Sequence, residues 1–194
     1  MTVRDLMPTA ARRVAAVARG AAQADLHNPT PCTDFDLGTL VTHFAGTTSG
    51  MVRAARREAL DPRNPWGAPP GLTEGDWASD LADNVEEVGQ AWSDPEAWTG
   101  SVDLAGSSMP ASMCGGMAFV EILLHGWDLA AASGQQLQLD PGVGEELRRV
   151  IAETAEHGRQ MHAYGPEVPV PASADDFDHA LGLAGRDPGW QAPA

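Results

Sequence analysis

Apolar positions recur along this chain with the period of an α-helix, and they predict five long helices. With 3.6 residues per turn, apolar residues three and four apart share one face. The patterns place helices at about 2–24, 36–60, 73–92, 113–133 and 140–163. The alternating patterns of β-strands are almost absent. The predicted fold class is therefore all-α, an up-and-down bundle of antiparallel helices.

Residues typical of helix ends stand at the borders of these patterns. They are Asp34 or Asp36 before the second helix, Thr73 with Asp76 as a weak capping box at the third, Gly134 after the fourth, and Asp140-Pro141 at the start of the fifth.

The rest of the chain is predicted to be irregular. The loop 61–72 contains four prolines, and 97–112 holds the one plausible hairpin, with Ala105-Gly106 in its turn. The tail 164–194 reads as mostly extended, with a short helix near 175–184. We expect one domain over 1–194, with a core bundle at about 1–163 and the tail as an appendage.

The predicted fourth helix is apolar almost all the way round, which indicates that it is buried. Its exceptions are Glu121, His125 and Asp128, which fall in one narrow stripe at about 100° of rotation per residue. Buried ionisable groups are costly unless they are paired or bind a metal. We therefore expect the function to reside in this stripe, where Glu121 and His125, spaced i and i+4, can bind one ion.

A third ligand must come from another helix, and His43 is the best candidate. It lies in the middle of the second helix, between Leu40 and Phe44. Taken alone, a histidine there is more often a satisfied core residue, but opposite Glu121 and His125 we favour a ligand. Two histidines and one glutamate form a recurrent zinc site with an open position for water or substrate. Such sets also accept nickel, iron or cobalt.

Asp128, one helical turn beyond His125, is the candidate catalytic residue. We expect its carboxylate to accept a ring N–H, to orient a ligand or to shuttle a proton, rather than to bind the ion. A hydrogen bond to a neighbouring loop or helix is an equal alternative. The remaining histidines are expected at the surface and both cysteines in packed structural positions: His27, His157, His162, His179, Cys32 and Cys114.

The charge balance restricts the partners. The chain has 27 acidic residues against 12 basic ones, a net charge of −15. Nucleic acids and anionic membrane surfaces both require a basic surface, so neither is expected as a partner. The sequence shows no apolar run long enough for a membrane span and no apolar segment typical of a secretory signal. Together with only two cysteines, these features predict a cytoplasmic protein.

Three segments resemble a known family: 30–46, 121–134 and 164–190. They are similar to the actinobacterial branch of the DinB-like metal-binding superfamily, which includes the N-terminal domain of mycothiol-dependent maleylpyruvate isomerase. The resemblance implies a DinB-like four-helix bundle with one divalent metal, usually zinc, and a homodimer is common among such proteins. It places the metal ligands at His43, Glu121 and His125. The isomerase has a second domain that supplies an arginine to its active site, for which the tail of this chain is too short, so maleylpyruvate isomerisation itself is not expected.

The leading interpretation is a metal-dependent enzyme that uses a low-molecular-weight thiol, mycothiol by resemblance, for S-transfer to a small electrophile or for its isomerisation. The ion would lower the pKa of the thiol and so favour the nucleophilic thiolate. We expect the site at one mouth of the bundle, near Thr47, Trp127 and the loop 93–112. The alternatives are a metal- or small-molecule-binding protein without turnover, a thiol-independent metal hydrolase, and a bundle in which Glu121 and His125 only hydrogen-bond.

Overall fold

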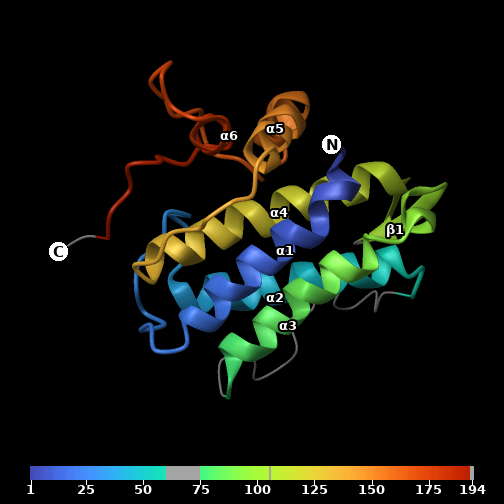
Figure 1. Ribbon diagram of the computed structural model, residues 1–194, viewed down its shortest axis with the longest axis horizontal. Coiled ribbons are helices and arrows are strands. Elements are labelled where there is room, and N and C mark those ends of the chain that lie inside the picture. The colour runs from blue at the N-terminus through green and yellow to red at the C-terminus, as the bar shows by residue number, and fades with distance from the viewer. Residues whose placement is uncertain (60–74, 105, 193–194) are drawn as a thin grey trace.

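The computed structural model describes residues 1–59, 75–104 and 106–192, and this part of the chain is mostly helical (Figure 1). The elements are α1 (Val3–Gly20), α2 (Leu37–Ala55), α3 (Trp77–Ala91), a 3-10 helix η1 (Pro95–Trp98), β1 (Ser101–Leu104), β2 (Ser107–Pro110), α4 (Ala111–Ala132), α5 (Val143–Gln160) and α6 (Asp176–Leu183). The all-α class, the hairpin and the short helix in the tail are confirmed.

Helices α1 to α4 form a DinB-like four-helix bundle. Helix α1 packs against α3 and α4, and α2 packs against the same two helices, so that the four surround one core. Helices α5 and α6 pack on each other and lie to one side of the bundle, next to α4 (Figure 1). The antiparallel hairpin β1–β2 joins η1 to α4 at one end of the bundle. The division into a core bundle and a tail stays a prediction.

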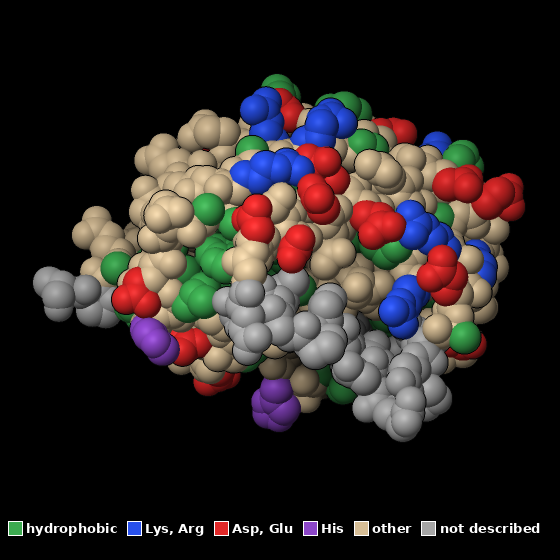
Figure 2. Space-filling model, turned by 90° about the horizontal axis from the view of Figure 1, so that it is seen from below, with side chains coloured by type: hydrophobic (Ala, Val, Ile, Leu, Met, Phe, Trp, Pro, Cys, Tyr) green, Lys and Arg blue, Asp and Glu red, His purple; other side chains and the backbone are tan. Residues whose placement is uncertain are grey.

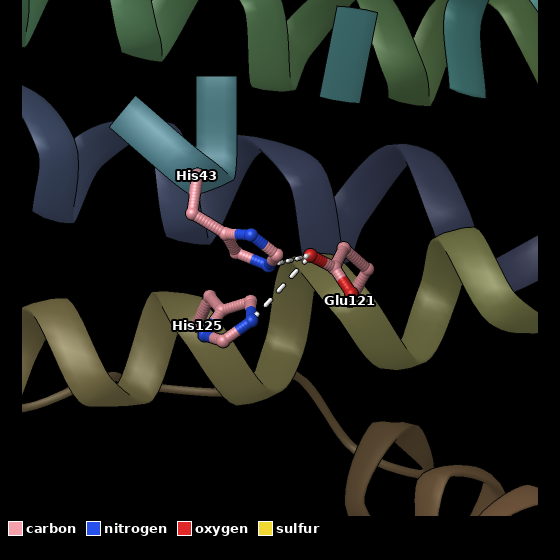
Figure 3. A group of neighbouring side chains, drawn as sticks. All are labelled: His43, Glu121 and His125. Carbon is pink, nitrogen blue, oxygen red and sulfur yellow. Dashed lines mark ion pairs between the residues drawn. The ribbon is translucent and has the colours of Figure 1, made fainter. Parts of the chain in front are cut away.

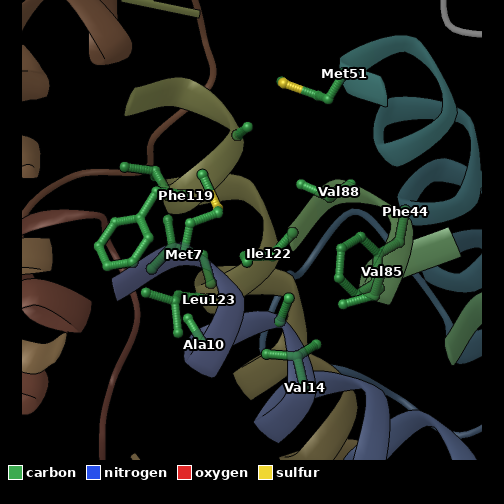
Figure 4. Close-up of a cluster of buried hydrophobic side chains, with 14 of the residues drawn as sticks. Met7, Ala10, Val14, Phe44, Met51, Val85, Val88, Phe119, Ile122 and Leu123 are labelled. Atoms are coloured by element: carbon green, nitrogen blue, oxygen red, sulfur yellow. The ribbon is translucent and has the colours of Figure 1, made fainter. Parts of the chain in front are cut away.

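All four bundle helices contribute to the core (Figure 4). Its completely buried side chains include Met7 from α1, Phe44 from α2, Val85 from α3 and Ile122 from α4. Each helix buries the apolar stripe that its sequence period predicts, since removing apolar surface from water is the dominant stabilising contribution.

The predicted helix ends largely agree with the structure. Asp36 caps α2, where its Oδ1 accepts a hydrogen bond from the N–H of Thr39 at 2.8 Å. Asp76 caps α3, and Gly134 follows α4 with a φ of +70°, a conformation that glycine adopts without strain. The predicted role of Thr73, the loop 61–72 and Ala105 of the hairpin turn lie outside the described residues.

The prediction that Asp140 caps α5 is wrong. Helix α5 begins at Val143 and is preceded by Gly142, whose φ is +85°. The carboxylate of Asp140 instead accepts hydrogen bonds from Thr9 and Arg13 of α1, with Arg13 Nη2 and Asp140 Oδ1 2.6 Å apart. A long-range ion pair has therefore displaced the local cap, and the link between α4 and α5 is held against α1.

Candidate metal centre

The three predicted ligands lie together between α2 and α4 (Figure 3). Glu121 Oε1 is 3.3 Å from Nε2 of His43 and 3.4 Å from Nε2 of His125. One ligand atom from each residue falls within 4.8 Å of the other two. Glu121 and His125 meet because residues four apart on a helix share a face, and His43 meets them because α2 packs along α4.

Aromatic rings fix the two imidazoles. The His43 and His125 rings have centroids 4.9 Å apart and planes at 79°. Phe35, from the loop before α2, lies over both, 5.1 Å from His43 and 6.4 Å from His125 between centroids. The loop is itself fixed, because the hydroxyl of Thr30 donates to the carbonyl oxygen of Phe35 at 2.8 Å. Phe35 thus covers one side of the cluster, a contact that the sequence reasoning missed.

Glu121 carries an oxygen without a partner. Its Oε1 is buried and has no hydrogen bond to any of the described residues. Burial raises the pKa of this carboxyl group, but the charge of His125 and the contact with His43 outweigh burial and bring the pKa to about 2. The ionised oxygen, buried without a hydrogen bond, is an unsatisfied acceptor that faces two imidazole nitrogens. It fits a divalent cation, and the nitrogen and oxygen donors are those that zinc accepts.

Asp128 lies behind His125, away from the cluster. Its side chain is completely buried, and its Oδ2 is 2.9 Å from Nδ1 of His125. Arg186 makes two hydrogen bonds to the same carboxylate, from Nη2 to Oδ2 at 3.0 Å and from Nε to Oδ1 at 3.3 Å. Burial raises the pKa of Asp128, while Arg186 and His125 lower it further than burial raises it. Asp128 is therefore ionised and paired on both sides.

Sequence reasoning missed Arg186. The only signal that could have found it is electrostatic. It is the one arginine of the tail 164–194, and a buried aspartate on an apolar helix requires a cation. The path of an irregular tail, however, cannot be read from periodicity.

A cleft of about 2150 Å³ opens over the three clustered residues. It lies between α4 on one side and α5 with the tail on the other, and the hairpin region closes one end. Thr47 and the predicted loop 93–112 contribute to its lining, but Trp127 does not. The walls are largely apolar; they include Phe35, Trp98, Met109, Met117, Val120, Leu124 and Val150.

The other candidate residues lie outside the cluster. His27, His157 and His162 are exposed as predicted, whereas His179 is half-buried. Cys114 is buried as expected, and burial raises its pKa to about 12. Cys32 is only half-buried and lines the cleft. Its pKa is raised by burial and by the Asp128 carboxylate, so neither thiol is activated as a nucleophile.

The molecular surface agrees with the acidic composition. On the face shown in Figure 2, arginine side chains lie among acidic ones and form no continuous basic area. Ion pairs such as Arg56 with Glu87, 2.6 Å apart, occupy exposed positions. No helix within the described ranges combines the length and the apolar character needed to cross a membrane.

A four-helix bundle with two histidines and a glutamate gathered between two of its helices defines the DinB-like class of proteins. The chain belongs to the family of the mycothiol maleylpyruvate isomerase N-terminal domain, whose family model matches residues 7–130. Two relatives from Mycobacterium tuberculosis, the uncharacterized proteins MT0763 of strain CDC 1551 and Rv0738 of strain H37Rv, are each 30% identical over 165 residues. Each alignment covers 83% of this chain and 85% of the relative. No solved structure matches the chain.

Proposed function

We propose that this protein is a metal-dependent enzyme that brings a low-molecular-weight thiol, mycothiol, to a small electrophile for S-transfer or isomerisation. His43, Glu121 and His125 would hold the ion, most readily zinc and secondly nickel. The convergence of these three side chains at the base of a cleft carries the proposal. The family supports the choice of thiol. A cytoplasmic location belongs to the same proposal, since a thiol cofactor requires a reducing compartment.

A bound ion would act as a Lewis acid that lowers the pKa of a coordinated thiol. The chain's own residues would do the rest. The Glu121 carboxylate would offset part of the cation's charge, and the Asp128 carboxylate would accept a hydrogen bond from Nδ1–H of His125, which would leave the Nε2 lone pair facing the cluster. Phe35 excludes water from one side of the two imidazoles. We assign Asp128 to positioning, because its completely buried side chain has no path to a substrate in the cleft.

The cleft indicates the kind of electrophile. Its wall next to Glu121 consists of Met117, Val120 and Leu124 on successive turns of α4. Such a wall favours an apolar group beside the reacting carbon. In the proposed chemistry the thiol sulfur forms a bond to that carbon. A transfer ends when the leaving group departs with the bonding electron pair, and an isomerisation ends when the new carbon–sulfur bond breaks again.

The test is the metal content of untagged protein, with His43→Ala beside the wild type and His27→Ala as a matched control. His27 is exposed and lies outside the cluster. We expect about one equivalent of zinc or nickel in the wild type and the control, and almost none in His43→Ala. No metal in the wild type after reconstitution would refute the proposal.

Turnover assays then separate the enzyme from its alternatives. We expect consumption of an electrophile only when thiol and metal are both present. Turnover without thiol would indicate hydrolysis by activated water. Tight metal binding without turnover on any thiol and electrophile pair would indicate a binding protein instead.

A further inference from the structure

Arg186 is buried in the wall of the cleft, where the protein itself holds its guanidinium. Only 8% of its side chain is exposed. Nη2 and Nε donate to the two oxygens of Asp128, and Nη1 donates to the carbonyl oxygen of Ala184 at 3.2 Å. Three of its five N–H groups therefore have protein acceptors, and two of these three bonds go to Asp128.

The tail is built to bring Arg186 to this place. Gly165 and Gly185 touch through their backbones, since a Cβ added at Gly185 would lie 2.6 Å from Cα of Gly165. Gly185 also has a φ of +82°, which favours glycine. The N–H of Val168 donates to the carbonyl oxygen of Gly182 at 2.9 Å. The residue after Gly185 is therefore held in one position.

The contacts of Arg186 continue through Asp128 to His125. An imidazole that donates its Nδ1 proton to a carboxylate keeps its lone pair on Nε2, and its ring cannot rotate without breaking that bond. The Nε2 of His125 is the atom that faces Glu121 at 3.4 Å. A completely buried carboxylate without a cation is strongly destabilising. The orientation of Asp128, and with it that of His125, thus depends on Arg186.

We propose that Arg186 is a positioning residue of the metal centre, which acts through Asp128 to hold Nε2 of His125 toward Glu121 and His43. This inference rests on the proposed function only in requiring that the cluster binds a metal; it requires no thiol and no turnover. It assigns to the last segment of the described chain a part in metal binding, although the three clustered residues themselves belong to α2 and α4 (Figure 3).

A purely structural role is the competing explanation, in which Arg186 only fastens the tail to the bundle. Arg159 offers a matched control, because its Nη1 donates to the carbonyl oxygen of Leu183 at 3.2 Å and so also fastens the tail. Arg159 makes no contact with Asp128 or with the cluster. Arg186→Met and Arg159→Met therefore each remove one hydrogen bond to a carbonyl oxygen of the tail, and only the first also removes the contacts with Asp128.

The experiment measures zinc affinity by competition with a chromophoric chelator, in the absence of any thiol, together with the visible spectrum of cobalt-substituted protein. We expect Arg186→Met to weaken zinc binding by about tenfold to a hundredfold, the usual effect of removing an outer hydrogen-bond partner of a ligand. Its cobalt spectrum should change as well. Arg159→Met should leave affinity and spectrum unchanged while both variants lower the thermal stability of the metal-free protein.

Two further variants test the positioning role of Arg186 if Arg186→Met folds poorly. Arg186→Lys preserves the charge but not the paired geometry, so its affinity should lie between those of the wild type and Arg186→Met. In an Asp128→Asn background, replacing Arg186 should cause little additional loss, because both changes break the same chain of contacts.

The outcomes distinguish this inference from the proposed function. Wild-type zinc affinity in Arg186→Met or in Arg186→Lys, with an unchanged cobalt spectrum, would overturn the positioning role and leave the proposed function standing. Equal losses in Arg159→Met and Arg186→Met would also overturn it in favour of a structural role. A wild type that binds no zinc would refute the proposed function and this inference with it.

Discussion

The two faces of α4 differ both in packing and in the kind of side chain that they carry. One face meets α1 so closely that a Cβ added at Gly126 would lie 2.6 Å from Cγ2 of Val14. The other holds Glu121 and His125 at the edge of an open cleft. Close apolar packing stabilises a fold, whereas burying ionisable groups costs free energy. One helix thus separates stability from the candidate chemistry, and each face can be tested on its own.

The largest expected effect on the free energy of unfolding concerns the face of α4 that holds Glu121 and His125. Zinc at a hundredfold excess over its dissociation constant should raise the free energy of unfolding of the wild type by about 2.7 kcal/mol. Glu121→Gln removes the charge of a ligand at nearly constant volume, so it should lose most of this gain. The metal-free variant should be less stable than the metal-free wild type at neutral pH, because it loses the contacts with His125 and His43 that lower the pKa of the Glu121 carboxyl group to about 2. Chemical denaturation with zinc and with chelator measures both.

An equal rise in the free energy of unfolding of wild type and Glu121→Gln on adding zinc would show that the face of α4 with Glu121 and His125 is not a metal site. A metal-free variant as stable as the metal-free wild type would show that the two imidazoles do not stabilise the Glu121 carboxylate in the absence of an ion.

Replacing either of two glycines of α4 with alanine should change the free energy of unfolding by an intermediate amount. Gly126→Ala places a methyl group against the branched Val14 side chain, and such overpacking costs about 1–3 kcal/mol. Gly116→Ala is its matched control on the cleft side, where the nearest atom to the new Cβ is Cγ1 of Val150 at 3.9 Å. There the better helix propensity of alanine should stabilise the protein by up to about 1 kcal/mol. Unfolding of the metal-free variants should therefore shift in opposite directions.

If both alanine variants were more stable than the wild type, the contact between α1 and α4 would be looser than the structure shows. The two faces of α4 would then differ in polarity but not in how closely they pack.

The smallest effect concerns Asp140, in the connection that leads from α4 to α5. The hydrogen bonds from Arg13 and Thr9 lower its pKa from 3.8 to about 2. Because the pKa is depressed in the folded state, the stabilisation is fully present above the unfolded value and is lost as the pH falls from about 4 toward 2. Asp140→Asn should be slightly less stable than the wild type at neutral pH, and the difference should close at about pH 2.

Urea denaturation across this pH range tests the link. A difference that stays constant down to pH 2 would show that the asparagine disturbs the connection for a reason other than charge.

The sequence was most informative where helical spacing decides which residues are neighbours. Glu121 and His125 share a face in any α-helix, and an apolar helix with only a few ionisable residues indicates where to look. His43 required one more assumption, that α2 and α4 lie side by side, and the structure brings the three residues together as expected. Their role as ligands stays a prediction.

The sequence was least informative where a contact joins irregular segments. Asp140 followed by Pro141 is a strong local signal for a helix start, but it cannot reveal that Arg13, far away in the sequence, takes the carboxylate. Phe35 and Arg186 belong to segments without periodicity, so nothing local predicts that both approach His125 or its partner. At Asp140 a long-range electrostatic contact prevailed over a local preference, whereas Phe35 and Arg186 offered no local signal to override.

The pairing of Asp128 with Arg186 also bears on the order of folding. The two residues are 58 positions apart, and closing so long a loop carries an entropic cost before the contact stabilises anything. Asp128 gains its guanidinium partner only when the tail reaches α4, so the support of His125 depends on a contact that forms at a high entropic cost.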